Sequence, residues 1–444
     1  MKWLLRAYSC RTTALTALSR SSRRLLLAML SGCLLTFSVM ASDLNSSLTL
    51  DQALRLAQGR SRQLKAQDAM ASAARDMAVA AGERPDPTLK AGINNLPVDG
   101  ADRYSVARDF MTMRSVGVAQ EFTREDKLKA RAARFDREAE AAEAGHALAL
   151  SNLQRDTAMA WLDRYYQERM REVLVSQHDE AKLQIEAADA AYRGGKGSQA
   201  DVFAARAAVA QIEDRIAQTE RQIVTAKTQL APWIGDSATQ SLGSLPALDS
   251  VRLSPADLET RLVHHPQIAV MVKQENMAEA DAELARANRE SDWSAELMYS
   301  QRGPAYSNMI SFNVSIPLQW DREHRQDREL AAKLAQAEQM RAEREEASRA
   351  HFAEALSMLQ EWQSDHERLG RYDASLIPLA EARTQAAIAA YRGSSGMLGA
   401  VLDARRNEID TRMDRLRLDM ETARLWAQLN YLIPVGHDEA PSSQ

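Results

Sequence analysis

Two halves of the sequence repeat one pattern, and this duplication constrains the fold more than any other feature. Residues 190–206 share nine identities with residues 389–405, all at an offset of 199. The same offset still aligns Leu230 with Leu429, so no insertion falls between these segments. Self-similarity at a fixed offset is the signature of a duplicated structural unit. We therefore expect two repeats of one architecture.

The first repeat is predicted at 42–247 and the second at 248–434, followed by a C-terminal tail at 435–444. A short amphipathic helix opens each repeat, at about 50–64 in the first and 255–268 in the second. An alanine-rich, charged helix follows in both. Glycine and proline are scarce and clustered, so most of the chain has nothing to interrupt long helices.

Each repeat then loses its helical pattern and alternates at a period of two, which is typical of strands with two unlike faces. The alternating segments are 88–95, 115–122, 295–299 and 310–318. Segments of about 8 to 10 residues have the length that a tilted strand needs to cross a bilayer. The sequence therefore predicts one strand hairpin per repeat, at about 88–122 and about 294–318.

Long helical hairpins follow the strands. A helix is predicted from about Arg124 to Tyr192, and its counterpart runs from about Asp321 to Tyr391, interrupted only by Pro378. About 69 residues of helix reach about 100 Å. Apolar residues recur at the spacings of coiled-coil seams: Leu128, Ala132, Phe135, Ala139 and Ala142 outward, and Val202, Val209, Ile212, Ile216, Ile223 and Leu230 on the return.

Glycines mark the turns between the outgoing and returning helices, at 194–198 and 393–396. Glycine supplies the positive dihedrals that a tight helix-to-helix turn demands. The fold class is thus mostly α with a small β part, built from long antiparallel coiled-coil hairpins and four strands. Four strands cannot close a barrel, and an open sheet edge in lipid leaves backbone groups unpaired. The chain is therefore expected to oligomerise, most simply as a trimer with 12 strands.

Composition excludes several classes of function. The net charge is -5, and basic residues alternate with acids along the predicted helices, so no nucleic-acid partner is indicated. No phosphate loop, Gly-x-Ser-x-Gly elbow or Cys-His pairing is present, so we expect neither enzymatic activity nor a cofactor. The histidines, including the neighbours His264 and His265, show no metal-binding spacing.

The N-terminal segment indicates export. Five arginines between Arg6 and Arg24 precede an apolar run over 25–41, which predicts a signal peptide at 1–41 with cleavage after Ala41. A retained membrane anchor and a lipoprotein box that leaves Cys33 lipidated are the alternatives. Both cysteines lie in this leader, so no disulfide is expected in the folded part. No later run of 18 or more apolar residues exists, and a membrane role must use strands.

The two-fold repeat and its glycine turns resemble the TolC family of outer-membrane efflux factors over residues 48–434. The overall length is similar to that of its heavy-metal branch, the CzcC and CusC type. This resemblance implies a trimeric duct with a 12-stranded β-barrel, a periplasmic helical tunnel and a tip that docks a periplasmic adaptor. The heavy-metal branch often carries a Gly-Lys pair after its second strand, where this chain has Thr123–Lys127.

Two segments look like the tip signature of that family, and they assign the adaptor-docking residues. These are Tyr192, Arg193, Gly194, Gly197, Tyr391, Arg392, Gly393 and Gly396. Asp201 and Asp403 follow the turns, where three-fold symmetry would gather carboxylates into a gate that cations and pH influence. The alternative is that each acid is a solvated residue favoured at a helix start. Arg193 and Arg392 either link neighbouring tips or are merely exposed.

Met111 and Met113 lie between the first two predicted strands, and their thioethers are the ligands that Cu(I) or Ag(I) prefers. Packing is the more ordinary role for such a pair. We predict no other metal ligands.

The sequence therefore favours the exit duct of a tripartite efflux system in the outer membrane, extending into the periplasm. The duct would contact outer-membrane lipid, a periplasmic membrane-fusion adaptor and an inner-membrane RND pump. Heavy-metal cations, either copper and silver or cobalt, zinc and cadmium, are the expected cargo, and drugs or organic solutes are the alternative. A periplasmic coiled-coil adaptor or structural rod is the alternative from another class, and the duplicated hairpins argue against it.

Overall fold

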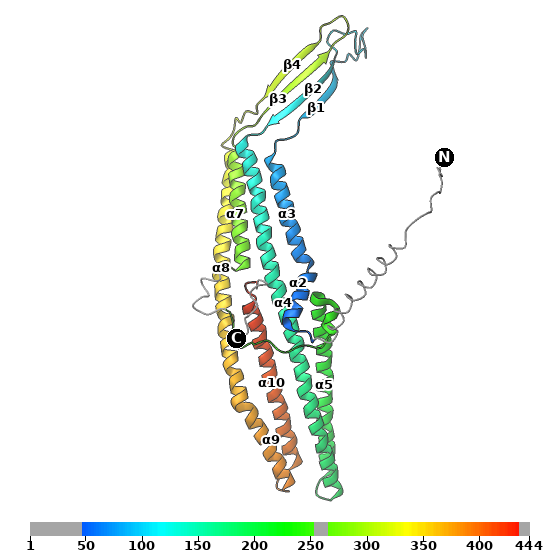
Figure 1. Ribbon diagram of the computed structural model, residues 1–444, viewed down its shortest axis with the longest axis vertical. Coiled ribbons are helices and arrows are strands. Elements are labelled where there is room, and N and C mark those ends of the chain that lie inside the picture. The colour runs from blue at the N-terminus through cyan, green and yellow to red at the C-terminus, as the bar shows by residue number, and fades with distance from the viewer. Residues whose placement is uncertain (1–46, 253–264, 435–444) are drawn as a thin grey trace, which may run out of the picture. The chain divides into compact units, whose positions relative to one another are not determined.

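The computed structural model describes residues 47–252 and 265–434. The chain divides into two units after Leu48, and the second unit, Thr49–Gln444, holds every helix and strand described below. This unit is mostly helical with one small antiparallel sheet (Figure 1). The predicted signal peptide, Cys33, His264 and the C-terminal tail lie outside the described residues, as does most of the helix predicted at 255–268.

Among the described residues, both repeats contain a helix, two strands and a long helical hairpin, in that order. The first consists of α2 (Leu50–Arg60), α3 (Arg62–Gly82), β1 (Thr88–Asn94), β2 (Met113–Phe122), α4 (Glu125–Arg193), α5 (Gln199–Ile234) and a 3-10 turn (Gly235–Thr239). The second consists of α7 (Pro266–Ala287), β3 (Trp293–Gln301), β4 (Met309–Ser315), α8 (Gln326–Arg371), a π-helix (Tyr372–Leu376), α9 (Ile377–Arg392) and α10 (Leu398–Asn430).

Three predicted elements differ from the structure by three or more residues at one end. The helix predicted at 50–64 breaks at Ser61, whose hydroxyl accepts a hydrogen bond from the Leu64 N–H and starts α3. The last strand ends at Ser315, not at 318, because Pro317 has no N–H to donate to a neighbouring strand. A turn occupies residues 321–325, so α8 begins later than predicted.

The interruption of the second long helix is a π-helix that ends just before Pro378. Proline cannot donate a backbone hydrogen bond, and its ring collides with the preceding helical turn. The wider π turn at Tyr372–Leu376 accommodates it, and Pro378 then lies in the first turn of α9. The counterpart helix α4 contains no proline and runs unbroken through 69 residues.

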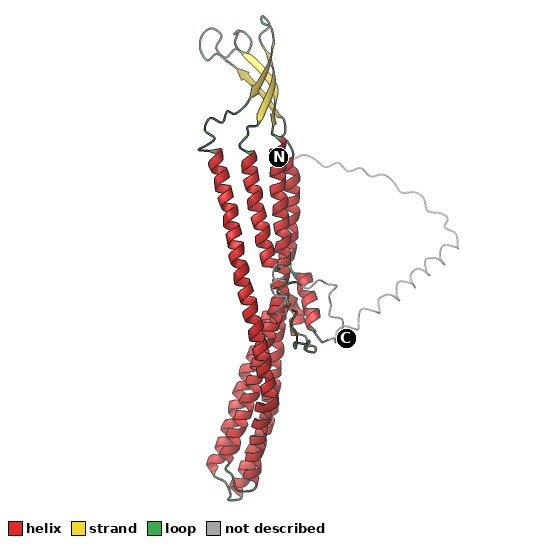
Figure 2. Ribbon diagram, turned by 90° about the vertical axis from the view of Figure 1, so that its left-hand side faces the viewer, coloured by secondary structure: helices red, strands yellow, loops and turns green. Residues whose placement is uncertain are grey.

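The helices form two four-membered rows that share the long helices (Figures 1 and 2). Next to the strands, contacts run from α3 to α4, from α4 to α7 and from α7 to α8. Toward the hairpin turns, contacts run from α5 to α4, from α4 to α10 and from α10 to α9. None of the helices among the described residues is both long and apolar enough to cross a membrane.

Seam residues hold these rows together. Leu174 and Met170 of α4, Val209 and Ile212 of α5 and Met413 of α10 are buried in one cluster. Many of the other buried positions are alanines, which let helix backbones approach closely. Val209 and Ile212, which belong to the seam predicted on the return helix, therefore pack against two other helices of the row.

The four strands form one antiparallel sheet in the order β1-β2-β3-β4, because β2 of the first repeat pairs with β3 of the second. Residues paired directly across strands share a face of the sheet. One face carries the rows Leu89–Val118–Leu297–Phe312 and Ala91–Val116–Tyr299–Ile310. The other face carries Lys90 and Glu296, whose Nζ and Oε2 atoms lie 2.6 Å apart. The sheet thus has one apolar and one polar face.

Candidate functional site

The two hairpin turns close with the same backbone hydrogen bonds. In the first turn, the N–H groups of residues 196–197 donate to the Ala191 carbonyl oxygen at 2.9 and 3.1 Å. In the second, those of residues 395–396 donate to the Ala390 carbonyl oxygen, both at 3.0 Å. These bonds occupy carbonyls that a helix end otherwise leaves without partners. The sequence repeat therefore extends to the hydrogen bonds of the tips.

The left-handed residue of each turn is the second residue after the helix's last tyrosine-arginine pair, at Gly195 and Ser394. Gly194 and Gly393 have φ values of -82° and -79°, because they continue the last helical turn. Positive φ occurs one residue later, at Gly195 (69°) and Ser394 (57°). The expectation that a glycine of the turn supplies the positive dihedral is confirmed in the first turn by Gly195 and is wrong in the second, where Ser394 adopts it. Ser394 holds a conformation that costs a non-glycine residue about 1 kcal/mol.

Gly197 and Gly396 must be small for a different reason, which is close approach. A Cβ atom on Gly396 would lie 3.0 Å from the Ala390 Cβ and 3.2 Å from the Tyr391 nitrogen. On Gly197 it would lie 3.2 Å from the Ala191 Cβ. The preceding helix end therefore packs directly on the start of the returning segment in both tips.

The structure brings the two tips together. Ala188, Val202 and Ala205 of the first hairpin are buried against Leu398 and Val401 of the second. The segments that carry the two tip signatures thus form one packed unit, with residues from both repeats in its core.

The surface of this unit exposes apolar side chains. Tyr192 is 47% exposed, Phe203 57% and Met397 80%. Tyr391, the counterpart of Tyr192, instead packs half-buried against the core of the tips. Arg392 ends α9 and is exposed. The two copies of the tip signature therefore present different surfaces.

Asp201 acts as a helix cap within the chain. Its carboxylate accepts hydrogen bonds from the Ser198 N–H (2.9 Å) and the Ser198 hydroxyl (2.7 Å). These bonds, the backbone one first, lower the pKa of Asp201 below its ordinary value. Asp403 lies exposed on α10. Arg193 pairs with Asp189 of the same helix at 2.8 Å.

The methionine pair lies at the far side of the sheet from the helices. Met111 is exposed in the loop between β1 and β2, and Met113 is the first residue of β2. Within residues 47–252 and 265–434, no group of three or more histidine, cysteine, aspartate or glutamate side chains is placed to hold a metal ion.

His265 serves as a helix cap. Its Nδ1 accepts a hydrogen bond from the Gln267 N–H at 3.2 Å at the start of α7. Its ring stacks on that of His351, with centroids 5.1 Å apart. Burial, assisted by the neighbouring His351, lowers the pKa of His265 to about 4, so this side chain is neutral near pH 7.

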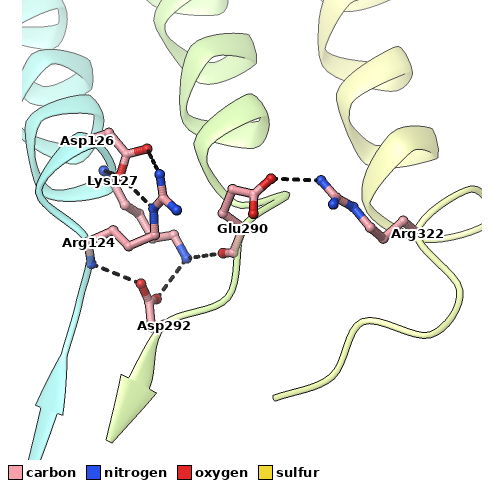
Figure 3. Close-up of polar contacts among 6 residues, drawn as sticks. All are labelled: Arg124, Asp126, Lys127, Glu290, Asp292 and Arg322. Atoms are coloured by element: carbon pink, nitrogen blue, oxygen red, sulfur yellow. Dashed lines mark hydrogen bonds and ion pairs between the residues drawn. The ribbon is translucent and has the colours of Figure 1, made fainter. Parts of the chain in front are cut away.

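A buried ion pair connects the two repeats where the strands meet the helices (Figure 3). The Lys127 Nζ donates to the Asp292 Oδ2 at 2.7 Å and to the Glu290 carbonyl oxygen at 3.1 Å. The other oxygen of Asp292 accepts a hydrogen bond from the Arg124 N–H at 3.0 Å. The Lys127 side chain is only 6% exposed and that of Asp292 16%. We name this pair the junction latch.

The electrostatics of the latch favour the charged carboxylate. Burial alone raises the pKa of Asp292, but the hydrogen bonds from Lys127 and from the Arg124 N–H, with the charge of Lys127, outweigh it. The pKa of Asp292 therefore lies below its ordinary value. Two surface ion pairs flank the latch, Arg124–Asp126 at 2.8 Å and Arg322–Glu290 at 3.0 Å (Figure 3). Such exposed pairs contribute little.

The arrangement of strands, rows and tips is similar to that of several solved structures. The outer-membrane channel OprN is 18% identical, with a TM-score of 0.73 over 87% of this chain and 90% of that one. VceC, an outer membrane protein of Vibrio cholerae, is 19% identical, with a TM-score of 0.72 over 86% of this chain and 95% of that one. This chain shares their fold.

CusC, whose structures concern folding and transmembrane channel formation, also has this fold. It is 18% identical, with a TM-score of 0.69 over 86% of this chain and 91% of that one. The sequence itself matches no family model and no curated protein.

No motif in the sequence distinguishes Lys127 and Asp292 from other charged residues. Lys127 follows the predicted strand at 115–122, and Asp292 immediately precedes β3. A lysine after one strand and an aspartate before another are a weak signal. They indicate an ion pair only once β2 is known to pair with β3. The pairing of strands from different repeats supplied that information.

We predict that Gly396→Ala loosens the tip while the rest of the fold persists. The added Cβ would meet the Ala390 side chain and backbone, and overpacking of this kind costs about 1 to 3 kcal/mol. Hydrogen exchange of amides 389–400 should accelerate about tenfold or more. Gly399→Ala is the matched control, because a Cβ there meets nothing within 4 Å. Equal exchange rates in the two variants would refute the close-approach argument.

We predict that Asp292→Asn lowers the free energy of unfolding by about 2 to 3 kcal/mol, because it leaves the Lys127 ammonium buried without a counter-charge. The folded pKa of Asp292 is lowered, so its contribution is complete above about pH 4 and is lost as pH falls through the folded value. The variant should therefore lose less stability on acidification.

Denaturant unfolding in detergent at pH 7 and at about pH 3 measures both effects. Lys129→Gln is the control, since its ion pair with Glu125 is exposed and should contribute below about 0.5 kcal/mol. An Asp292→Asn variant as stable as this control would show that the latch contributes nothing.

Proposed function

We propose that three copies of this chain close into an outer-membrane exit duct, in which a 12-stranded β-barrel continues into a periplasmic tunnel of helices. One observation carries the proposal. The sheet and the helix row beneath it are open arrays with the same order, β1-β2-β3-β4 above α3-α4-α7-α8. Every residue of the edge strands β1 and β4 is exposed in the single chain. A neighbouring copy would close both arrays by one operation.

The two faces of the sheet support a membrane position for the strands. Strands of a membrane barrel alternate between lipid-facing apolar residues and lumen-facing polar residues. The rows containing Leu297 and Tyr299 suit the lipid side, and the pair Lys90–Glu296 suits a water-filled lumen. A soluble rod would have no lipid to cover this apolar face, so the face argues against the structural-rod alternative.

The tips would contact the adaptor. The hairpin turns lie at the opposite end of the helices from the strands (Figure 1), and the apolar surface that Tyr192, Phe203 and Met397 form there suits a protein partner. The proposed docking region also includes Arg193, Gly194 and Gly197 of the first tip and residues 391–396 of the second. Asp201 and Asp403 are proposed to line the closed end of the tunnel in the assembled trimer, although Asp201 also caps its own helix. Energy for transport would come from an inner-membrane RND pump.

For the cargo we propose heavy-metal cations, on the length that the chain shares with the heavy-metal branch of the family it resembles. The fold itself does not select the cargo, since the TM-score is 0.69 with CusC and 0.73 with OprN. Deletion of the gene should therefore lower the tolerated concentration of copper, silver, cobalt, zinc or cadmium. A strain sensitised only to organic solutes would replace the metal proposal with the drug or organic-solute alternative.

We predict that the chain is recovered from the outer-membrane fraction and has three times the mass of the mature chain by native mass spectrometry in detergent. Edge strands pair with edge strands, and closure removes unpaired backbone groups that cost several kcal/mol each in lipid. Incorporation into planar bilayers should produce ion conductance. A soluble monomer without conductance would contradict the duct.

A further inference from the structure

The junction latch joins two specific pairs of elements. Lys127 lies on α4 just after β2, and Asp292 lies just before β3 at the end of the segment that leaves α7. The open ends of the arrays have elements of the same types. On one end, β4 leads into α8, and on the other, α3 leads into β1. Because the two repeats have the same elements at these junctions, we expect one end to carry a cation equivalent to Lys127 and the other an acid equivalent to Asp292.

The cationic half is found by aligning the residues that follow β2 and β4. Phe122–Lys127 reads Phe-Thr-Arg-Glu-Asp-Lys, and Trp320–Arg325 reads Trp-Asp-Arg-Glu-His-Arg, at an offset of 198. An aromatic residue begins both segments, an Arg-Glu pair lies at their centre, and a cation ends each of them. Arg325 is therefore the counterpart of Lys127.

The offset of 198 differs from the 199 found at the tips, and the π-helix accounts for the difference. A π turn is an α-helix with one inserted residue. Before the π-helix, buried Trp161 matches buried Leu359 at 198, and after it buried Ala181 matches buried Ala380 at 199. The alignment of Lys127 with Arg325 therefore agrees with the packing of the long helices.

The anionic half lies before β1. Asp86 stands between α3 and β1 as Asp292 stands between α7 and β3, 206 residues further along. The same offset aligns the apolar residues Leu89 and Ala91 of β1 with Ala295 and Leu297 of β3. Asp86 is therefore the counterpart of Asp292.

Asp86 and Arg325, unlike the latch residues, have no side-chain partner within the part of the chain that the structure describes. Both are exposed, and neither side chain makes a hydrogen bond or ion pair with any of the described residues. Their repeat counterparts, Lys127 and Asp292, are buried against each other at 2.7 Å. Apolar side chains are also exposed at the end of the array that carries Asp86, namely Met70, Met77 and Val79 of α3.

We infer that Arg325 of one copy binds Asp86 of the next copy, in a second set of latches that repeats Lys127–Asp292 across each subunit boundary. The occupant of the open α3–β1 edge is thus the α8–β4 edge of another copy of this chain. This inference rests on the proposed closed duct and adds the contact that sets the register between copies. Around the strand-to-helix junction of a closed trimer, latches within one copy (Lys127–Asp292) would alternate with latches between copies (Arg325–Asp86).

Charge reversal tests the contact in the full chain. Asp86→Arg and Arg325→Asp should each lower the temperature at which the trimer dissociates in detergent, by about 5 °C or more, because like charges then meet at the boundary. The double variant Asp86→Arg with Arg325→Asp should restore most of that loss. Lys196→Glu, a charge reversal in the tip turn, is the control and should leave dissociation unchanged.

Cysteine pairs provide a second measurement. Asp86→Cys with Arg325→Cys should form a disulfide between chains under oxidation, visible as dimers and trimers in denaturing gels without reductant. Lys127→Cys with Asp292→Cys should form its disulfide within one chain. The single Asp86→Cys variant should remain monomeric on the same gel.

The outcomes separate the two proposals. Wild-type trimers with no cross-link at 86 and 325 and no rescue in the double reversal would overturn the latch and leave the duct intact. A wild-type chain that never forms trimers would overturn the duct and the latch with it. Rescue together with the inter-chain disulfide establishes the contact.

Discussion

Unpaired backbone N–H and C=O groups run along both edges of the four-stranded sheet, at β1 and β4. In water such an edge is a template for another strand, and in lipid each unpaired group is costly. The helix row next to the sheet also has two open ends, because α3 and α8 each have a helix neighbour on one side only. One neighbouring copy placed at each edge would therefore pair the free backbone groups of the edge strands and cover the apolar side chains of the end helices. The other features of the chain, including its duplicated architecture, suit repetition around a closed ring.

Duplication does not make the two halves equivalent. Ser198 and Asp201 form a capping box at the start of α5, whereas Met397 occupies the same place before α10 and offers no side-chain cap. Tyr192 is exposed and Tyr391 is half-buried. A trimer would therefore present two kinds of tip in alternation. A partner with two non-identical contacts could use that difference, because specificity depends on differences in contact free energy.

Charges at the strand-to-helix junction have unequal roles. The exposed pairs around Arg124 and Arg322 are screened by water and contribute little. Lys127 and Asp292 are largely removed from water, so each requires the other, and a displaced register would leave a buried charge unpaired. The latch therefore specifies which strand meets which helix more than it stabilises the fold.

Local patterns in the sequence determined the elements of this protein. The period of two placed strands at 88–95 and 115–122, and the absence of proline placed the 69-residue helix α4, because both depend on neighbouring residues alone. Tertiary structure decided the rest. The positive φ at Gly195 and Ser394, the π-helix before Pro378 and the pairing of β2 with β3 arise from how segments meet. Lys127 and Asp292 are 165 residues apart, and no local pattern relates residues that only packing brings together.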